Sequence, residues 1–262
     1  MAPRADELLA QAQGLVPLAS HRGEQGLLLA KAQGCRVYDA DNVGLVDLTA
    51  GGGSCLLGYA NQYVLDAIRK ATTLGLASGF ASAMEVEVAE ALAEFLPTYR
   101  PFVLTSSETE AFELALRFCR RHTGRLRLVI FDGNRTGAVE ALQVVPGGPV
   151  GLSLPKIAGL LPDLMRTVRV VPWGNAEALA RVLDEVGVDT AAVVLDPIAS
   201  NFGVIPPDPH FLTRVRELSR AVGALLVLDE TLTGFRLDRG GANQVFRLEA
   251  DLLVLGGALG GG

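Results

Sequence analysis

Lysine, cysteine and tryptophan are scarce in this chain of 262 residues. Lysine occurs only at Lys31, Lys70 and Lys156, so few side chains can supply a reactive amine. The three cysteines have no metal-ligand spacing and follow no secretory signal, which excludes a disulfide framework and predicts a reducing environment. No apolar stretch reaches the roughly 20 residues of a membrane span. We therefore expect a cytoplasmic protein without a membrane partner and without a metal site.

The charged residues that are present have an acidic balance. A net charge of -6 and a pI near 5.2 argue against a nucleic acid as partner. Hydrophobic residues make up 49% of the chain and charged residues 20%, which is typical of a globular protein with a large core. One basic stretch is interpreted as the solvated face and end of a helix: Arg117, Arg120, Arg121, Arg125 and Arg127.

Apolar runs alternate with amphipathic stretches along most of the chain. The runs predict strands at 102–105, 127–131, 167–171, 191–195, 224–229 and 251–255. The amphipathic stretches predict helices at 4–13, 61–74, 83–95, 108–122, 175–186 and 209–222. A β-hairpin is predicted from 35–39 and 45–48 around a turn. Strands that alternate with helices indicate a mainly parallel sheet, whose ligands gather at the carboxyl ends of the strands.

Two motifs follow the last two predicted strands. The run 224–229 ends in DETLTGFR, which begins at Asp229, and the run 251–255 leads into LGGALGGG at 255–262. Upstream, GCRVYDAD at 34–41 and DPIASNFGVIPP at 196–207 come in matching order. Together these motifs resemble the class III aminotransferases, and within them the glutamate-1-semialdehyde aminomutases. In that family the octet reads Leu-Gly-Lys-Ala-Leu-Gly-Gly-Gly, so Gly257 stands at the lysine position.

The resemblance implies a fold and a chemistry. The fold is the three-layer α/β large domain of pyridoxal phosphate (PLP) transferases of the aspartate aminotransferase type. The family lysine forms a Schiff base with PLP and moves a proton at the substrate carbon, and glycine can do neither. The aspartate at the position of Asp229 keeps the ring nitrogen protonated. We therefore predict no catalytic residue at Gly257, and vestigial cofactor contacts at Asp229 and Thr231.

The family's phosphate-binding turn corresponds to Ser107, Glu108 and Thr109. Free N–H groups at a helix N-terminus suit an anion, but Glu108 replaces a glycine and its carboxylate would repel phosphate. An ordinary capping box formed by Ser107 and Glu110 explains the same residues without a ligand, and we prefer this interpretation. Arg135 replaces the family tyrosine that stacks on the cofactor ring. An ion pair between Arg135 and Glu108 is a conceivable repair of an emptied pocket.

Family members continue beyond the triple glycine with one more strand of the sheet and a C-terminal small domain, and we expect both to be absent here. We expect the chain to divide into 1–55, an N-terminal helix and hairpin, and 56–262, an incomplete large domain. The open sheet predicts a homodimer or a heteromer with an aminotransferase-like or other chain.

Three functions remain open at this point. The first is a catalytically inactive, structural or regulatory oligomer subunit that binds no cofactor. The second is a PLP- or pyridoxamine phosphate (PMP)-dependent aminotransferase or aminomutase that is active only with a partner chain, which requires that the PLP site survives. The third is a binding module for a small anion, with Arg135 or Arg236 as its counter-charge.

Overall fold

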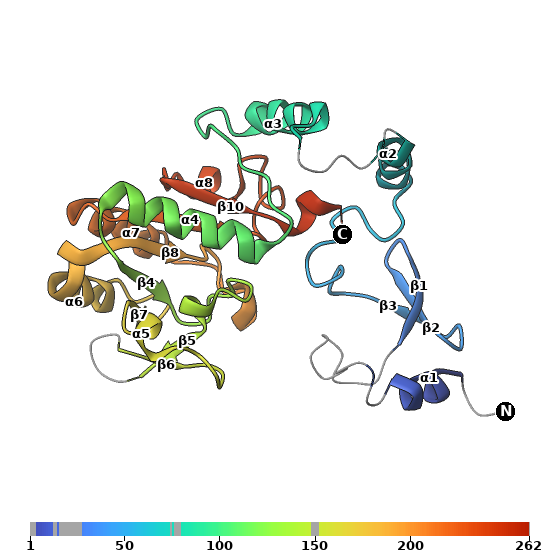
Figure 1. Cartoon of the computed structure of the whole chain (residues 1–262), viewed down its shortest axis with the longest axis horizontal. Helices are drawn as coiled ribbons and strands as arrows, with labels where there is room; N and C mark the ends of the chain where they lie inside the picture. Colours follow the sequence, from blue (N-terminus) through green and yellow to red (C-terminus); the bar gives the residue numbers. More distant parts are fainter. Residues whose placement is uncertain are drawn as a thin grey trace. The chain divides into compact units, whose positions relative to one another are not determined.

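The computed structural model describes residues 4–12, 15, 28–73, 75, 80–147 and 152–261. Two compact units share these residues: one consists of residues 1–80 and 257–262, the other of residues 81–256 (Figure 1). We describe each unit by itself. The division predicted after residue 55 stays a prediction.

The first unit contains a small antiparallel sheet of three strands in the order β1-β2-β3. Its elements are α1 (Arg4–Ala12), β1 (Leu29–Gln33), β2 (Arg36–Asp39), β3 (Gly44–Val46), α2 (Gln62–Thr73) and the 3-10 helix η6 (Gly257–Gly260). The pairing of β2 with β3 confirms the predicted hairpin. Asp39 shapes its turn, because the carboxylate accepts hydrogen bonds from the N–H groups of Asp41 and Val43.

A polar turn follows this hairpin. The carboxylate of Asp47 accepts hydrogen bonds from the backbone and hydroxyl of Thr49, from the Gly51 N–H and from the Tyr59 hydroxyl. These donors hold the pKa of Asp47 well below its ordinary value, the Thr49 hydroxyl contributing most. The same contact with Asp47 raises the pKa of Tyr59 to about 12. Tyr59 therefore has a structural partner within the first unit.

The second unit is built around a parallel sheet of five strands in the order β10-β9-β8-β4-β7. These strands are β4 (Arg127–Phe131), β7 (Val168–Val171), β8 (Thr190–Leu195), β9 (Leu225–Glu230) and β10 (Leu252–Leu255). The helices are α3 (Ala83–Phe95), α4 (Glu108–Thr123), α5 (Pro162–Met165), α6 (Ala176–Val186), α7 (Pro209–Ala221) and α8 (Gly241–Phe246). A hairpin of β5 (Val144–Pro146) and β6 (Ser153–Pro155) completes the unit.

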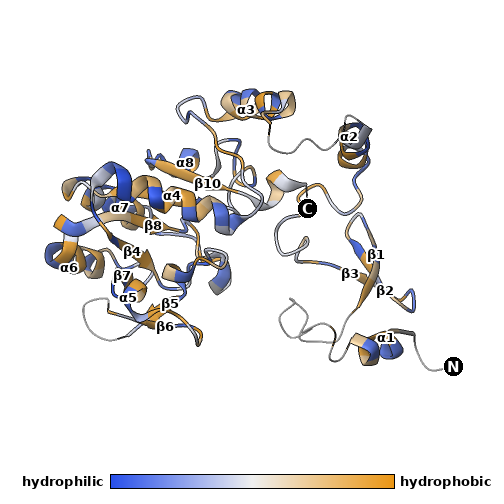
Figure 2. Cartoon of the chain, viewed as in Figure 1, coloured by the Kyte–Doolittle hydropathy of each residue, from blue (hydrophilic) through white to orange (hydrophobic). Residues whose placement is uncertain are grey.

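Two apolar cores sandwich this sheet. Alternate strand side chains pack with α4 on one face, as Leu128, Ile130 and Val194 do, and with α6 and α7 on the other face. Figure 2 shows these strands coloured mostly as hydrophobic, which fits strands buried on both faces. The observed three layers confirm the predicted α/β class.

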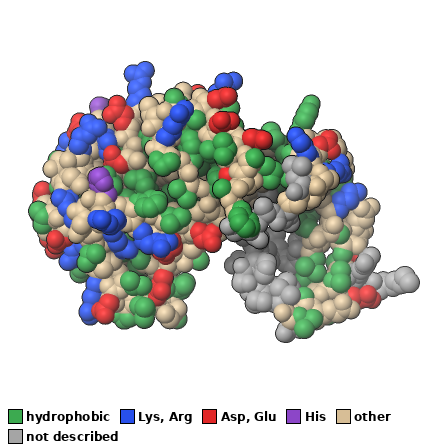
Figure 3. Space-filling model, turned by 45° about the horizontal axis from the view of Figure 1, so that its top comes forward, with side chains coloured by type: hydrophobic (Ala, Val, Ile, Leu, Met, Phe, Trp, Pro, Cys, Tyr) green, Lys and Arg blue, Asp and Glu red, His purple; other side chains and the backbone are tan. Residues whose placement is uncertain are grey.

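On the face drawn in Figure 3, acidic and basic side chains are interspersed.

One predicted strand is wrong. Residues 102–105 form no strand, and in the described part of the chain no other segment pairs with them. An apolar run becomes a strand only when a neighbouring segment pairs with its backbone N–H and C=O groups. None of the described strands pairs with residues 102–105. The remaining predicted strands are present within one or two residues of the expected bounds. Among the described residues, no helix is long and apolar enough to cross a membrane.

Candidate functional site

The carboxyl ends of β8 and β9 carry a buried acidic cluster. Asp229, near the end of β9, is 5% exposed, and its Oδ1 accepts hydrogen bonds from the N–H and hydroxyl of Thr231 at 3.0 and 2.6 Å. Burial, and then the nearby charge of Asp196, raise the pKa of Asp229 to about 8, and Glu108 adds to this effect. Without a cation beside it, this carboxyl is therefore largely protonated near neutral pH.

Asp196 follows directly after β8 and is 6% exposed. Burial raises its pKa to about 7, although the Ile198 N–H donates to its carboxylate. Its backbone is held on two sides, because the Trp173 indole N–H donates to the Asp196 carbonyl at 2.9 Å and the Asp196 N–H donates to Asn134. Asp196 thus has a fixed place beside Asp229.

Glu230, the last residue of β9, is also buried, but its hydrogen bonds indicate a different role. Its carboxylate accepts hydrogen bonds from the Thr233 hydroxyl and from the N–H groups of Ala242 and Asn243 at the start of α8. Gly241 makes room for this carboxylate, since a Cβ there would overlap its Oε2. Burial raises the pKa of Glu230, and the helix contacts oppose that shift. We interpret Glu230 as a structural residue that anchors α8.

The N-terminus of α4 is capped by a side chain of its own segment. The Glu110 N–H donates to Ser107 Oγ at 3.2 Å, and the Ser106 N–H donates to the Glu110 carboxylate at 2.8 Å. This is the predicted capping box, except that the carboxylate binds the N–H of Ser106, one residue before the cap. The N–H groups of Glu110 and Ser106 are therefore occupied by side chains. Glu108, partly buried in the first turn, brings a further negative charge.

The loop after β4 lies against the same turn. The Ala138 N–H donates to Thr109 Oγ1 at 2.9 Å, and a Cβ at Gly137 would lie 2.5 Å from that oxygen. Gly137 also has a φ of 60°, so glycine is required there for two reasons. Arg135 is exposed, and in the described part of the chain no ion pair joins it to Glu108. The conceivable Arg135–Glu108 pair is therefore wrong.

Gly257 begins η6, two residues after β10 ends. Its φ is 53°, in the left-handed region that glycine adopts without strain. Gly256, the preceding residue, lies beside Thr231, because a Cβ at Gly256 would be 3.4 Å from the Thr231 Cγ2. β10 therefore delivers the chain next to the Asp229 motif.

The structure thus brings Asp229, Thr231 and Glu108 together, and joins Thr109 to the loop after β4. It leaves Arg135 in solvent. Asp196 and Asn134 are members of the site that were not predicted as such. A signal for Asp196 existed, since carboxyl ends of parallel strands share one edge of a sheet, and β8 neighbours β9. Among the described residues, no group of His, Cys, Asp and Glu could hold a metal ion.

Comparison with known proteins decides the family. The family model for aminotransferase class III matches residues 19–262. The chain belongs to the class III aminotransferase family. It is 36% identical to glutamate-1-semialdehyde 2,1-aminomutase of Aquifex aeolicus over 92% of this chain, and 38% identical to that of Sorangium cellulosum over the same share. The chain spans only 57% and 55% of the length of these two relatives.

Solved structures agree with this family. An omega-transaminase from Sphaerobacter thermophilus matches with a TM-score of 0.92 and 28% identity, over all of this chain and 62% of that one. A glutamate-1-semialdehyde aminomutase variant from Pseudomonas aeruginosa, with a lysine replaced by alanine and in complex with PMP, matches with a TM-score of 0.80. That variant is 33% identical over 90% of this chain and 51% of its own. The class III large-domain fold is therefore established for this chain.

Proposed function

We propose that this chain is a class III aminotransferase-like protein that forms no lysine Schiff base and acts as a structural or regulatory subunit of an oligomer. The observation that carries the proposal is the missing amine. Gly257 occupies the position that the family pattern gives to the lysine, and it has no side chain. A lysine at its φ of 53° would also be strained by on the order of 1 kcal/mol.

No other lysine takes over this role within the sequence. Lys31, Lys70 and Lys156 are all exposed, and Lys31 lies over the ring of Tyr38. The amines of such exposed lysines are solvated, whereas a Schiff-base lysine works from a desolvated site. The residues of this chain therefore do not fit a cofactor that is held covalently.

The phosphate side of the site supports the same proposal. Ser107 and Glu110 engage two donors near the start of α4, and Glu108 adds negative charge where an anion would bind. A phosphate at about 4 Å from a poorly solvated carboxylate is repelled by roughly 4 kcal/mol per unit charge, for an effective dielectric near 20. We propose that Glu108 weakens phosphate binding and that Ser107 and Thr109 serve the fold.

A second function is favoured by one specific feature. Asp229 keeps a buried carboxyl whose Oδ1 is positioned by Thr231, which is the arrangement that would accept a protonated ring nitrogen. A relative in which a lysine is replaced by alanine is described in complex with PMP. Noncovalent binding of PMP or PLP, with an amine from a partner chain, is therefore the alternative. A small-anion site at Arg135 or Arg236 stays a prediction without such support.

Covalent trapping separates these functions. The full chain is mixed with PLP, reduced with borohydride, and its intact mass and peptides are measured. We expect no stoichiometric addition at any one lysine. Binding of PMP, followed by calorimetry, tests the alternative; we expect no binding, and binding that is lost in Asp229→Asn would establish the second function instead.

A replacement experiment tests the roles of the two substituted positions. We expect that Gly257→Lys alone is not modified by PLP, because Glu108 still repels the phosphate. Gly257→Lys with Glu108→Gly should then gain modification at residue 257. Modification of the single variant to the same extent as the double variant would show that Glu108 does not obstruct the site.

A further inference from the structure

Two arginines lie on the same face of the parallel sheet, on neighbouring strands. Arg127 begins β4, and Arg169 lies within β7, where its register partner on β4 is Val129. Val129 packs into the core that α6 covers, and side chains alternate along a strand, so both arginines are on the α6 face. They lie toward the amino ends of these strands, whereas Asp229 lies near the carboxyl end of the parallel strand β9.

One backbone carbonyl brings the two guanidinium groups together. Nη1 of Arg127 donates to the Arg166 carbonyl at 3.1 Å, and Nη1 of Arg169 donates to the same oxygen at 3.3 Å. The two Nη1 atoms are therefore no farther apart than these two distances combined. Arg166 is the C-cap of α5, so both bonds also satisfy a carbonyl at a helix C-terminus. A guanidinium has several further N–H donors, which this carbonyl does not use.

The described part of the chain balances the charge of this pair only in part. The carboxylate of Asp189 lies 3.8 Å from Arg127 Nε, and its side chain is 68% exposed. Arg169 has no ion pair among the described residues, although the exposed Glu185 on α6 attracts it electrostatically. Burial, and then the positive charge of Arg127, lower the pKa of Arg169. An anion beside the two guanidinium groups would relieve their repulsion.

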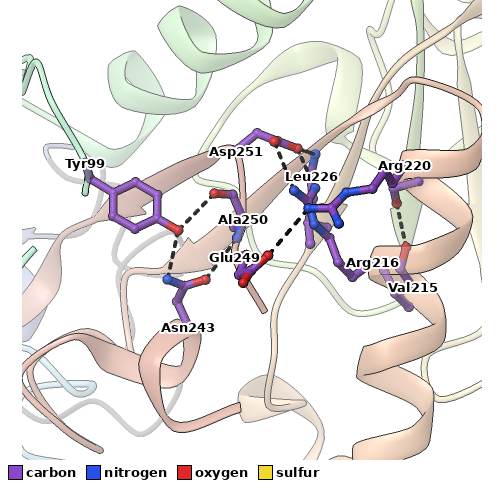
Figure 4. A network of polar contacts seen from close by, with 10 residues as sticks. Tyr99, Val215, Arg216, Arg220, Leu226, Asn243, Glu249, Ala250 and Asp251 are labelled. Atoms are coloured by element: carbon purple, nitrogen blue, oxygen red, sulfur yellow. Dashed lines mark hydrogen bonds and ion pairs between the residues drawn. The ribbon is translucent and has the colours of Figure 1, made fainter. Parts of the chain in front are cut away.

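Arg216 on α7 shows how this protein compensates another partly buried arginine. Its guanidinium forms a bidentate ion pair with Asp251, at 2.7 and 3.2 Å (Figure 4). The Nε atoms of Arg216 and Arg169 are both buried without a hydrogen-bond partner among the described residues. The Asp251 carboxylate offsets this loss for Arg216, whereas no described carboxylate pairs with Arg169. The counter-charge that Asp251 gives to Arg216 is therefore missing at Arg169.

We propose that Arg127 and Arg169 bind a phosphate group, either as inorganic phosphate or as part of a phosphomonoester. Guanidinium groups form charge-assisted hydrogen bonds with phosphate oxygens. Because the two arginines come from different strands, they approach an anion from two directions, and a tetrahedral phosphate presents an oxygen to each. Its charge of about −1.5 to −2 near pH 7 matches two guanidinium groups. The site lies away from Asp229, so the inference goes beyond the proposed function and does not rest on it.

Calorimetric titration of the full chain with inorganic phosphate tests the site, with chloride holding the ionic strength constant. We expect saturable binding at one site per chain. Arg127→Gln and Arg169→Gln should each weaken it at least about tenfold, because each loses a charged hydrogen-bond donor. Arg121→Gln, at an exposed position in the last turn of α4, is the matched control and should bind as wild type does. A titration with methyl phosphate separates the two sources: equal affinity indicates a phosphomonoester, and much weaker binding indicates free phosphate.

NMR of the arginine Nε–H groups adds a measurement on the wild type. Phosphate should shift the signals of Arg127 and Arg169 and leave that of Arg121 unchanged. Three results would overturn the proposal: no binding of phosphate to the wild type, binding that survives in folded Arg169→Gln, or unshifted signals of both arginines. A purely structural role of the pair predicts the first of these, with both variants less stable than wild type. Far-UV circular dichroism checks that the variants fold; if they do not, the NMR titration of the wild type decides.

Discussion

Replacement of Asp229 by asparagine tests the description of the acidic cluster. Asparagine keeps an oxygen for the two hydrogen bonds from Thr231 but cannot ionise. Its effect on stability should therefore depend on pH. The sign follows from the pKa of Asp229, which rises from the ordinary aspartate value of 3.8 to about 8 in the folded protein. Between these values the folded state binds more protons than the unfolded state, so stability contributed by this group falls as pH rises.

The magnitude can be bounded from the same values. At about 1.4 kcal/mol per pH unit, the change between pH 5 and pH 8 is at most roughly 4 kcal/mol. Water and neighbouring groups relax around a carboxylate as it ionises, so we expect about 2 kcal/mol. We compare the free energy of unfolding of Asp229→Asn with that of wild type at each pH. This difference should be about 2 kcal/mol more favourable to the variant at pH 8 than at pH 5.

Urea unfolding at pH 5 and pH 8 measures this difference. Asp184→Asn, at an exposed position of α6, is the matched control and should show little dependence on pH. Equal destabilisation by Asp229→Asn at both pH values would refute the reasoning. It would mean that the carboxylate is charged in the folded protein, with a cation beside it.

Further predictions concern residues that hold the site and the first unit. Glu230→Gln should cost about 2 kcal/mol in urea unfolding at pH 7, because its NH₂ group would face a backbone N–H at the start of α8; an unchanged midpoint would contradict the structural role of Glu230. Gly137→Ala should destabilise by about 2 kcal/mol, and Gly159→Ala, which has a positive φ but no neighbour within 4 Å, should cost less. Tyr59→Phe should destabilise in urea unfolding at pH 7, because it removes the hydroxyl that donates to the Asp47 carboxylate; an unchanged midpoint would contradict the Asp47 contact.

Much of the fold could be predicted from local pattern. The runs that became β4, β9 and β10 are uninterrupted and apolar, and capping residues mark the helices, such as Ser107 before α4 and Gly124 after it. The run 102–105 has the same local signal, but strand formation also depends on a paired neighbour. The β5-β6 hairpin and α8 were not predicted, because such short elements carry little periodicity.

The site was only partly predictable for a similar reason. Motif order indicated Asp229, Thr231 and the turn before α4. The role of Asp196 depends on β8 lying next to β9, and the capping of α8 by Glu230 depends on a contact between residues twelve or more apart. Neither can be read from spacing. The exposed position of Arg135 likewise follows from the path of its loop and not from its residue type.

We propose that this chain forms no Schiff base with PLP, because residue 257 is glycine. The most direct measurement is the peptide map of the full chain after incubation with PLP and reduction by borohydride. We expect no stoichiometric modification, with only traces spread over Lys31, Lys70 and Lys156. Complete modification of one of these lysines, accompanied by the visible absorbance of a Schiff base before reduction, would contradict it.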